Sequence, residues 1–360
     1  MERIKNVTVI AHGFGVKGFS GEKRVYLEAI KALQENGIGF KIVSFFKPSW
    51  TNEYEVKYLL PFQFTRFDKY QRLLIWFIAR RQRDTDLFLN LSGVPIPLSN
   101  ISKHVIYAGA PAIANVPTKY SSSLFWRLYI KPWSLIIKRL REEAKKAIFI
   151  ANSYYSKKAI EEVYQTNVEK VIYPPVNVEF FSKAFNENDR EPIILTIGRF
   201  ERGKMLENTI KVSSRAKVKA VIVGTLSDKK YFEELNKLAK ELNADVTFLP
   251  NIRDEELLDI MRKASVYFHP TIGEHFGIPV VEAMSAGLIP IVPKESGSSE
   301  VVPEFSYSNL EEASDLVLKV INSGVTLRRE IQKRALAFSS SRFRRELIDS
   351  IFRLMTRQQP

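Results

Sequence analysis

Two glutamates eight positions apart, Glu274 and Glu282, mark the stretch of this sequence that is best suited to chemistry. An apolar run precedes a glycine-containing loop that carries Glu274, and Pro279 then fits the first turn of a helix, where proline's missing N–H is not needed. The pattern predicts a strand, a loop and a helix that contains Glu282. The free N–H groups at such a helix start can bind phosphate or sugar oxygens, and here they belong to Phe276, Gly277 and Ile278.

A second group of interest follows the apolar run that ends at Gly198, where Arg199 and Lys204 occur close together. Both could be surface charges, but a position just after a strand favours phosphate contacts. Arginine can bind two phosphate oxygens at once, while lysine supplies a point charge. Together they would stabilise the negative charge that develops on a departing diphosphate.

A glycine-rich loop follows the first apolar run, with glycines that include Gly13, Gly15 and Gly21. Such a loop lets the backbone approach a ligand closely, although an ordinary strand–helix turn has the same composition. His12, at the end of that run, is either a polar group near the reacting centre or a structural histidine. This region therefore leaves two interpretations open.

The elements that must position these residues alternate regularly along the chain. Apolar runs such as Asn6–Ala11 and Gly39–Phe45 predict buried strands, and Gly21–Asn36 between them predicts a helix. This alternation is typical of βαβ units and parallel sheets. It is interrupted at Pro174-Pro175 and the polar segment Phe185–Glu191, so we expect a linker there between two α/β domains. Two such doubly wound domains would bind a ligand in the cleft between the carboxyl ends of their strands.

The segment from His269 to Pro303 closely resembles the E-x7-E signature of retaining glycosyltransferases of family 4, which have the GT-B fold of two Rossmann-like doubly wound domains facing a central cleft. Ile193–Lys204 resembles that family's diphosphate motif, and Thr247–Leu257 resembles its base-recognition loop. Val171–Val176 resembles its interdomain junction. The matches cover most of residues 145–300 in the expected order.

The resemblance implies three parts of the chain. Residues 1–175 would form an acceptor-binding, membrane-proximal domain, residues 176–339 a nucleotide-sugar-binding domain, and residues 340–360 a helix that crosses back to the first domain. It also implies a nucleotide-sugar donor, with GDP-mannose favoured over a UDP-sugar, and no cofactor or metal. The residues implied in catalysis are Glu274, Arg199, Lys204 and His12. Those implied in donor binding are Gly13, Gly15, Gly21, Arg199, Lys204, Asn251, Ile252, Glu274, His275, Phe276, Gly277, Ile278 and Glu282.

Within this set, Glu274 is expected to face the sugar and Glu282 the ribose, and main-chain groups near Asn251-Ile252 are expected to read the base. His275 could cap its loop or contact the sugar, and His269 is expected to be a structural residue at a strand end.

Three features depart from or compete with this pattern. Ser20–Val25 differs from the family's Gly-Gly-x-Glu-Arg helix start, so the side chain that faces the phosphates is not identified there. Tyr107–Pro111 lacks the histidine that mannosyltransferases of dolichol-linked oligosaccharides often carry, and His104 is expected on a strand. Asp84-Thr85-Asp86 has the spacing of a metal site, but a helix end followed by a strand start is favoured.

Charge is unevenly distributed along the chain, because residues 1–180 carry 27 basic and 15 acidic residues whereas residues 181–360 carry 27 and 25. An anionic partner is expected for the first half. Tyr70–Arg83 and Leu124–Arg141 mix aromatic with basic residues, which suits either a helix at an anionic membrane surface or a core helix with a solvated face. The basic residues concerned are Arg72, Arg80, Arg81, Arg83, Lys131, Lys138, Arg139 and Arg141.

The function expected is that of a hexosyltransferase that moves a sugar, mannose favoured, to a lipid-linked glycan or another membrane-proximal acceptor. A soluble glycan or sugar-phosphate acceptor is the alternative, and a nucleic-acid-binding protein is a distant one because no nucleic-acid-binding motif is present. No signal peptide or 18-residue apolar run occurs, which indicates a cytoplasmic protein, peripheral on the cytoplasmic face of a membrane. The absence of cysteine excludes disulfides and thiolate metal sites.

Overall fold

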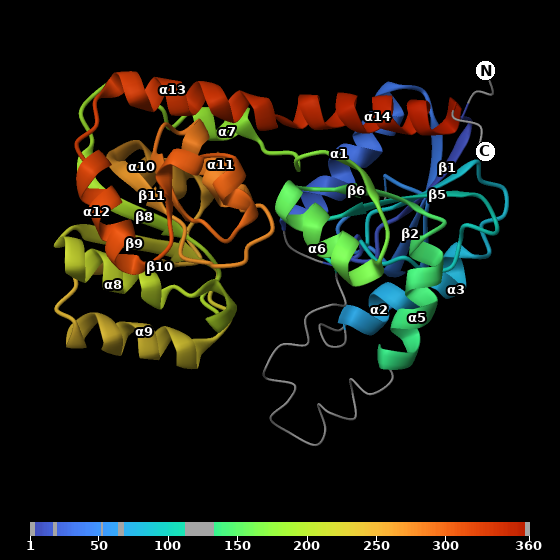
Figure 1. Ribbon diagram of the computed structural model, residues 1–360, viewed down its shortest axis with the longest axis horizontal. Coiled ribbons are helices and arrows are strands. Elements are labelled where there is room, and N and C mark those ends of the chain that lie inside the picture. The colour runs from blue at the N-terminus through green and yellow to red at the C-terminus, as the bar shows by residue number, and fades with distance from the viewer. Residues whose placement is uncertain (1–3, 17–19, 52, 64–67, 112–132, 357–360) are drawn as a thin grey trace. The chain divides into compact units, whose positions relative to one another are not determined.

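The computed structural model describes residues 4–16, 20–51, 53–63, 68–111 and 133–356. The chain forms two compact units, one from residues 1–175 together with 341–360 and the other from residues 176–340 (Figure 1). We call them unit 1 and unit 2. Each has its own parallel sheet and its own hydrophobic core.

Unit 1 is built on a seven-stranded sheet in the order β3-β2-β1-β4-β5-β6-β7, and every neighbouring pair is parallel. Its strands are β1 (Asn6–Ile10), β2 (Gly39–Phe46), β3 (Val56–Leu60), β4 (Leu87–Asn90), β5 (Lys103–Ala108), β6 (Ile148–Ala151) and β7 (Val168–Val171). Its helices are α1 (Gly21–Glu35), α2 (Asp68–Leu74), α3 (Trp76–Ala79), α5 (Trp133–Ala144), α6 (Tyr154–Tyr164) and α14 (Ser340–Thr356).

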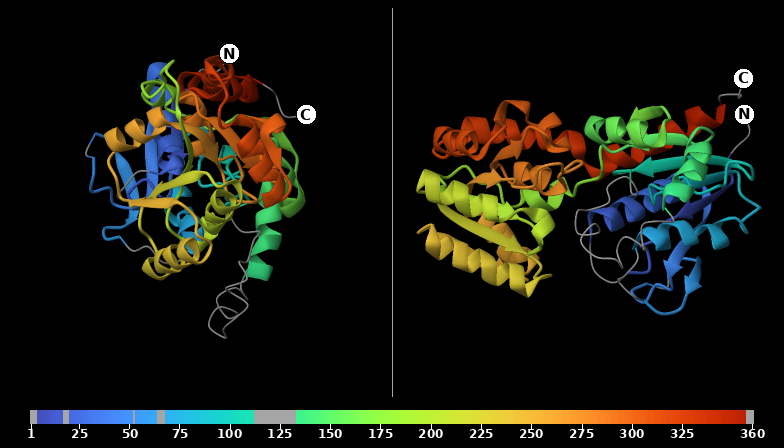
Figure 2. Two further views of the ribbon diagram at one scale, coloured as in Figure 1. Left: turned by 90° about the vertical axis from the view of Figure 1, so that its left-hand side faces the viewer. Right: turned by 60° about the horizontal axis from the view of Figure 1, so that its bottom comes forward.

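The strands of unit 1 are apolar on both faces because helices cover both. Alternate residues of β1 show this, since Val7 and Val9 pack with α1 while Ile10 packs with α3 and α5 on the other face. The last helix, α14, contributes Phe343 and Leu347 to the same core as α1. Arg344 of α14 also pairs with two glutamates of α1, and the two helices lie side by side (Figures 1 and 2).

Unit 2 has a six-stranded parallel sheet in the order β10-β9-β8-β11-β12-β13. Its strands are β8 (Glu191–Ile197), β9 (Lys219–Gly224), β10 (Val246–Pro250), β11 (Ala264–Phe268), β12 (Ile289–Pro293) and β13 (Ser306–Tyr307). Helices α8 (Glu207–Ala216), α9 (Lys229–Glu241) and α12 (Leu310–Val320) cover one face. Helices α7 (Val178–Ser182), α10 (Asp254–Lys263), α11 (Ile278–Ser285) and α13 (Val325–Ala335) cover the other (Figure 1).

The expectation of two doubly wound α/β sheets is confirmed. The polar segment Phe185–Glu191 lies inside unit 2 rather than between the units. It is fixed there by two arginines, since Arg328 donates to the carbonyls of Asn186 and Asn188, and Arg190 donates to those of Met261 and Ala264. Strand β3 and helix α13 were not expected from the sequence.

Two passages of the chain lead from one unit to the other, and each is anchored on both sides. In unit 2, the N–H of Val176 donates to the carbonyl of Phe338 at 3.0 Å, and Val176 also forms a parallel bridge with Ser339. In unit 1, Arg342 donates to the carbonyl of Tyr173 at 2.9 Å. The outgoing and returning passages are therefore held beside each other.

Candidate nucleotide-sugar site

In unit 2, the point where the strand order reverses lies between β8 and β11, which is where ligands bind in sheets of this type. Two glycines bring the loops close together there. A Cβ on Gly224 would lie 1.9 Å from the carbonyl oxygen of Gly198, so only glycine fits at the end of β9. The chain after β8 can therefore turn sharply into the short helix η2 (Arg202–Lys204).

Lys204 is fixed by contacts with both loops of this edge. Its N–H donates to the carbonyl of Glu201 at 2.9 Å, and its own carbonyl accepts from the hydroxyl of Thr271 at 3.1 Å. Its Nζ donates to Oε2 of Glu274 at 2.7 Å. The lysine that follows β8 and the glutamate that follows β11 thus form a direct ion pair.

The charge state of Glu274 follows from this pairing. Burial by itself would raise the pKa of Glu274, but the Lys204 ammonium, His269, the Lys204 hydrogen bond and His275 together outweigh that effect and lower it. The carboxylate is therefore ionised at neutral pH. Burial also lowers the pKa of His275, against the opposing effect of Glu274, so that imidazole is neutral.

The loop after Glu274 leads into α11 through Gly277. Gly277 caps the helix with φ of 84°, a left-handed conformation that favours glycine. A Cβ there would lie 3.2 Å from Val280 and 3.3 Å from Ser298, so the position is also crowded. Phe276 is buried with its ring centre 5.7 Å from that of Phe338, which anchors the start of the helix.

Glu282 lies one turn into α11 and is buried. Its charge, together with that of Glu274, adds to the burial that raises the pKa of Tyr267 well above its ordinary value. Both glutamates of the pair identified from the sequence therefore lie around the end of β11.

His269, the residue after β11, lies at the centre of this arrangement. Its main chain is held on both sides, because its N–H donates to Ile291 at 2.8 Å and its carbonyl accepts from the hydroxyl of Tyr307 at 3.0 Å. Its side chain is 3% exposed. Burial lowers the pKa of His269 to about 4, with Glu274 raising it and Lys204 lowering it.

Arg199 and the loop after β10, which contains Asn251 and Ile252, follow the ends of strands at the same edge. The side chain of Arg199 is 61% exposed and pairs with Glu201 at 2.9 Å. Asn251 has φ of 58°, and its Oδ1 accepts from the N–H of Leu226 at 3.1 Å, so its side chain stabilises the turn. The neighbouring Ile252 is partly buried.

A segment after β12 also belongs to this edge, although the sequence reasoning did not single it out. The N–H of Gly297 donates to the carbonyl of Glu274 at 2.8 Å, and the N–H of Gly273 donates to the carbonyl of Glu295 at 2.8 Å. Ser298 packs against Gly277. The serine and glycine content of residues 296–299 directly after a strand was the signal available for it.

In unit 1, the strand order reverses between β1 and β4, and His12 lies at that point. His12 is buried, with Nδ1 3.1 Å from the hydroxyl of Tyr26 and 3.8 Å from Oε1 of Glu22. Arg72 pairs with Glu22 at 3.0 Å and donates to the carbonyl of Ser92 at 2.7 Å, which connects the start of α1 to the segment after β4.

The glycine-rich loop follows His12 and contains one glycine that is sterically required. A Cβ on Gly15 would lie 2.2 Å from the carbonyl oxygen of Phe46, whereas a Cβ on Gly13 would meet only ordinary contacts. Gly21 is the first residue of α1, after Ser20, whose hydroxyl caps the helix by accepting from the N–H of Lys23 at 3.1 Å.

The other histidine of unit 1, His104, lies on β5 as expected and belongs to a buried polar network. Its Nδ1 lies 2.8 Å from Oε1 of Glu143, and its Nε2 lies 3.1 Å from Nδ2 of Asn90. The carboxylate of Glu143 also accepts from the N–H groups of Leu98 and Ser99. These contacts join α5 to strands β4 and β5.

Asp86, part of the Asp-x-Asp spacing, accepts hydrogen bonds from the N–H groups of Lys5 and Asn6 at 2.8 and 3.0 Å. This carboxylate therefore supports the start of β1. Among the residues that the structure describes, no cluster of three or more histidines and carboxylates could hold a metal ion.

The basic aromatic stretch Tyr70–Arg83 forms the end of α2 and all of α3, and it has two faces. Ile75 and Ile78 pack into the core, while Leu74 and Phe77 are exposed. Arg80 is exposed and lies 4.4 Å above the ring of Trp76. Arg72 differs from the expectation of a basic surface because Glu22 holds it inward. Residues 124–132 of the second stretch, including Lys131, lie outside the described residues.

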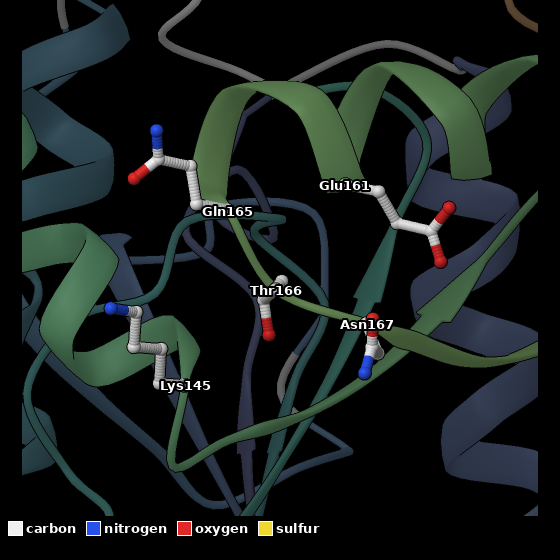
Figure 3. Close-up of a pocket in the computed structure, with 5 residues that line it drawn as sticks. All are labelled: Lys145, Glu161, Gln165, Thr166 and Asn167. Atoms are coloured by element: carbon white, nitrogen blue, oxygen red, sulfur yellow. The ribbon is translucent and has the colours of Figure 1, made fainter.

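A shallow depression of about 470 Å³ in unit 1 lies at a different place (Figure 3). It is lined by Lys145, Glu161, Gln165, Thr166 and Asn167. These residues surround the start of β7, and Figure 3 shows side chains that do not converge on one point. The depression is therefore at the amino edge of the sheet, opposite the edge where ligands bind in this fold.

Comparison with known proteins gives one family match, in which residues 177–337 match the family model of glycosyl transferases group 1. A GDP-Man:Man(3)GlcNAc(2)-PP-Dol alpha-1,2-mannosyltransferase of Dictyostelium discoideum is 26% identical over 209 residues, which cover 50% of this chain and 41% of that protein. The human protein of the same name is 26% identical over 239 residues, which cover 58% of this chain and 48% of that protein. The matched part thus spans less than half the length of these relatives.

Solved structures resemble almost the whole chain. The structure of HepE from Anabaena in complex with UDP and glucose has a TM-score of 0.69 at 17% identity, covering 96% of this chain and 99% of that one. Sucrose-phosphate synthase from Thermosynechococcus elongatus has a TM-score of 0.74 at 16% identity, covering 97% of this chain and 99% of that one. At these identities the likeness establishes the fold, which is the two-domain GT-B architecture.

Proposed function

We propose that this chain, whose residues 177–337 belong to the group 1 glycosyl transferases, is a retaining hexosyltransferase that uses a nucleotide-diphosphate sugar. The observation that carries the proposal is the ion pair between Lys204 and Glu274, 2.7 Å long, beside the N-terminus of α11. At this one sheet edge, a cation and a helix N-terminus suit the diphosphate of such a donor, and a carboxylate suits its sugar. The diphosphate needs positive charge, and the sugar hydroxyls need an acceptor.

In the proposed reaction, the bond between the anomeric carbon and the diphosphate oxygen breaks while the acceptor oxygen bonds to the same face of the sugar. The acceptor's hydroxyl proton passes to the departing diphosphate. Lys204 and Arg199 stabilise the charge that develops on that leaving group. Glu274 accepts hydrogen bonds from the sugar, and Glu282 from the ribose. For His12 in unit 1, the proposed role is that of a polar group in catalysis.

GDP-mannose is the donor we favour, because the names of the two mannosyltransferases described above include GDP-Man. A transfer assay in EDTA tests both points at once, with GDP-mannose and UDP-glucose compared as donors. Transfer of mannose in EDTA is the expected result. A strict requirement for an added divalent cation, or no nucleotide-sugar use at all, would contradict the proposal.

For the acceptor we favour a lipid-linked glycan at an anionic membrane surface on the cytoplasmic side. The supporting observation is the exposed pair Leu74 and Phe77, 40% and 46% exposed, next to Arg80 and Arg81. Apolar side chains flanked by arginine suit the boundary between headgroups and acyl chains. No helix within the described ranges is long and apolar enough to span a membrane.

The test is sedimentation with neutral and anionic liposomes over a salt series, together with transfer to a polyisoprenyl-linked oligosaccharide and to the same oligosaccharide freed from lipid. Binding to anionic liposomes should weaken as salt shortens the Debye length from about 10 Å at 0.1 M to about 3 Å at 1 M. The double variant Arg80→Glu/Arg81→Glu should bind less than Lys237→Glu/Lys240→Glu, which changes exposed charges on α9 equally. Equal transfer to both acceptors, without liposome binding, would favour a soluble acceptor instead.

A further inference from the structure

The imidazole of His269 carries a buried nitrogen that has no hydrogen-bond partner. The side chain is 3% exposed, and its Nε2 has no partner among the residues that the structure describes. Its other nitrogen, Nδ1, lies 3.3 Å from the hydroxyl of Tyr267. Because an unpaired buried polar atom destabilises the state in which it occurs, this nitrogen calls for a functional explanation.

The unpaired nitrogen lies at the N-terminus of α11. A Cβ built on Gly277, the residue that caps this helix, would be 3.6 Å from Nε2. The first N–H groups of a helix lack intrahelical acceptors. In α11 the N–H of Val280 already donates to the carbonyl of Gly277, so only N–H groups before Val280 can donate to a ligand. The helix dipole adds positive potential at the same place. The surroundings of Nε2 therefore suit an anionic ligand.

The tautomer of the imidazole follows from these neighbours. Its pKa of about 4 makes His269 neutral at pH 7, so it carries a single N–H. The N–H of Ile197 donates to the hydroxyl oxygen of Tyr267, which acts to lower the pKa of that tyrosine, so the hydroxyl hydrogen is available for Nδ1 of His269. We therefore assign the hydrogen to Nε2, with the Tyr267 hydroxyl donating to Nδ1.

We propose that the Nε2–H of His269 donates a hydrogen bond to a diphosphate oxygen of the nucleotide-sugar donor, and that it is unpaired only while the donor is absent. The inference rests on the proposed function and adds a neutral donor to the charged pair of Lys204 and Glu274. Because His269 is buried, contact requires a shift of the turn between Glu274 and Gly277. That turn is bounded by Gly273 and Gly277, and glycine adopts both positive and negative φ at little cost, so the backbone at these two positions can change conformation.

Two substitutions at His269 separate a binding role from a structural one. His269→Phe removes the N–H and keeps a ring of similar size, and His269→Gln keeps an N–H at a similar distance from the backbone. Without ligand, His269→Phe should melt near the wild-type temperature, because the loss of the unpaired Nε2 offsets the loss of the acceptor for the Tyr267 hydroxyl. It should nevertheless bind GDP and inorganic pyrophosphate about tenfold more weakly by calorimetry. His269→Gln should stay within about threefold of the wild type.

Tyr164→Phe is the matched control. The hydroxyl of Tyr164 is also buried without a partner, but it lies on α6 in unit 1. Its removal should likewise preserve or raise the melting temperature, and it should leave the affinity for GDP unchanged. If His269→Phe does not fold, Tyr267→Phe replaces it, because loss of the hydroxyl that orients Nδ1 should weaken GDP binding about threefold.

The outcomes distinguish this inference from the proposed function. A wild-type protein that binds neither GDP nor UDP contradicts the proposed function itself. A wild type that binds GDP, with His269→Phe binding it within twofold, overturns only the role of His269. Loss of melting temperature and affinity together in both His269 variants would show that the residue is structural, and it would also overturn the inference.

Discussion

His104 in unit 1 and His269 in unit 2 are both buried in parallel sheets, but their imidazoles are supported in different ways. Both ring nitrogens of His104 have partners, Glu143 at 2.8 Å and Asn90 at 3.1 Å. Within the described part of the chain, the imidazole of His269 has one hydrogen-bond partner, the hydroxyl of Tyr267 at 3.3 Å from Nδ1, and its Nε2 has none. The chain therefore satisfies both ring nitrogens of His104, whereas it leaves one ring nitrogen of His269 without a hydrogen bond.

The carboxylates beside the two histidines differ in the same way. Glu143 accepts from two main-chain N–H groups, which no ligand can remove. Glu274 is paired with the partly exposed side chain of Lys204, which a phosphate can draw away. The comparison teaches that one buried histidine is satisfied by the chain, whereas the other, on our proposal, is directed to a ligand.

The largest effect is expected from Glu143→Ala in unit 1. The change leaves His104 and the N–H groups of Leu98 and Ser99 without their acceptor, so the free energy of unfolding should fall by about 3–5 kcal/mol. Denaturant unfolding followed by far-UV circular dichroism measures the loss. Binding of GDP to the folded protein should be unchanged. A loss below about 1 kcal/mol would mean that His104 is not held as a structural residue.

In unit 2, Lys204→Ala should do the opposite of Glu143→Ala, because it should reduce activity and leave stability almost unchanged. Turnover should fall about 10²–10³-fold, because one group that stabilises the departing diphosphate is gone. The free energy of unfolding should change by less than about 1 kcal/mol, because the pair is partly exposed. Arg202→Ala, which removes an exposed cation of the same short helix, is the control and should keep near-normal turnover. Similar turnover in both variants would remove Lys204 from the site.

The pH dependence of stability sharpens the comparison of the two histidines. The pKa of His269 is about 4 in the folded state, against about 6.5 when unfolded. Between these values the unfolded state binds more protons, so the wild type should lose stability as pH falls from 6.5 to 4, by about 3 kcal/mol in total. His269→Phe lacks this loss, while any contribution of His104 is common to both proteins. A difference between the two proteins that does not change over this range would contradict a buried neutral imidazole.

The smallest expected effect is a change in GDP affinity that distinguishes the roles of Glu274 and Glu282 in unit 2. Glu282→Ala should weaken binding of free GDP about tenfold, because one charged hydrogen-bond acceptor for the ribose is lost. Glu274→Ala should slow transfer while GDP affinity stays within about threefold. Calorimetry with GDP alone provides the measurement, and the reverse pattern would mean that the two roles are exchanged.

The sequence was sufficient to predict most of the buried strands of both sheets, because each of these is a compact apolar run between polar turns. Strand β13 was missed because it is only two residues long. Strand β3 was missed because it lies at the sheet edge, where Lys57 and Tyr58 are exposed and the apolar signal is weak. Helix α13 was missed because only three of its residues, Arg328, Ile331 and Ala335, are buried. Elements that bury little surface leave little pattern in the sequence.

The residue types of the site were also predictable from their places after strands, but their pairings were not. Lys204 and Glu274 are 70 positions apart, and only the order of β8 and β11 brings them together. Arg72 was expected on a basic surface, yet Glu22, 50 positions away, holds it inward. His269 was expected to be structural, because a sequence cannot show that a buried nitrogen lacks a partner.

The discontinuous composition of unit 1 has a consequence for how the protein is made. Its core needs Phe343, Leu347 and Ile351 of α14, which are synthesised after the whole of unit 2. At about 5–20 residues per second, translation of residues 176–340 takes on the order of ten to thirty seconds. During that interval the nascent first sheet has an uncovered apolar face beside α1. The unit that begins first on the ribosome is thus the one that finishes folding last, and it is the part of the newborn chain most in need of a chaperone.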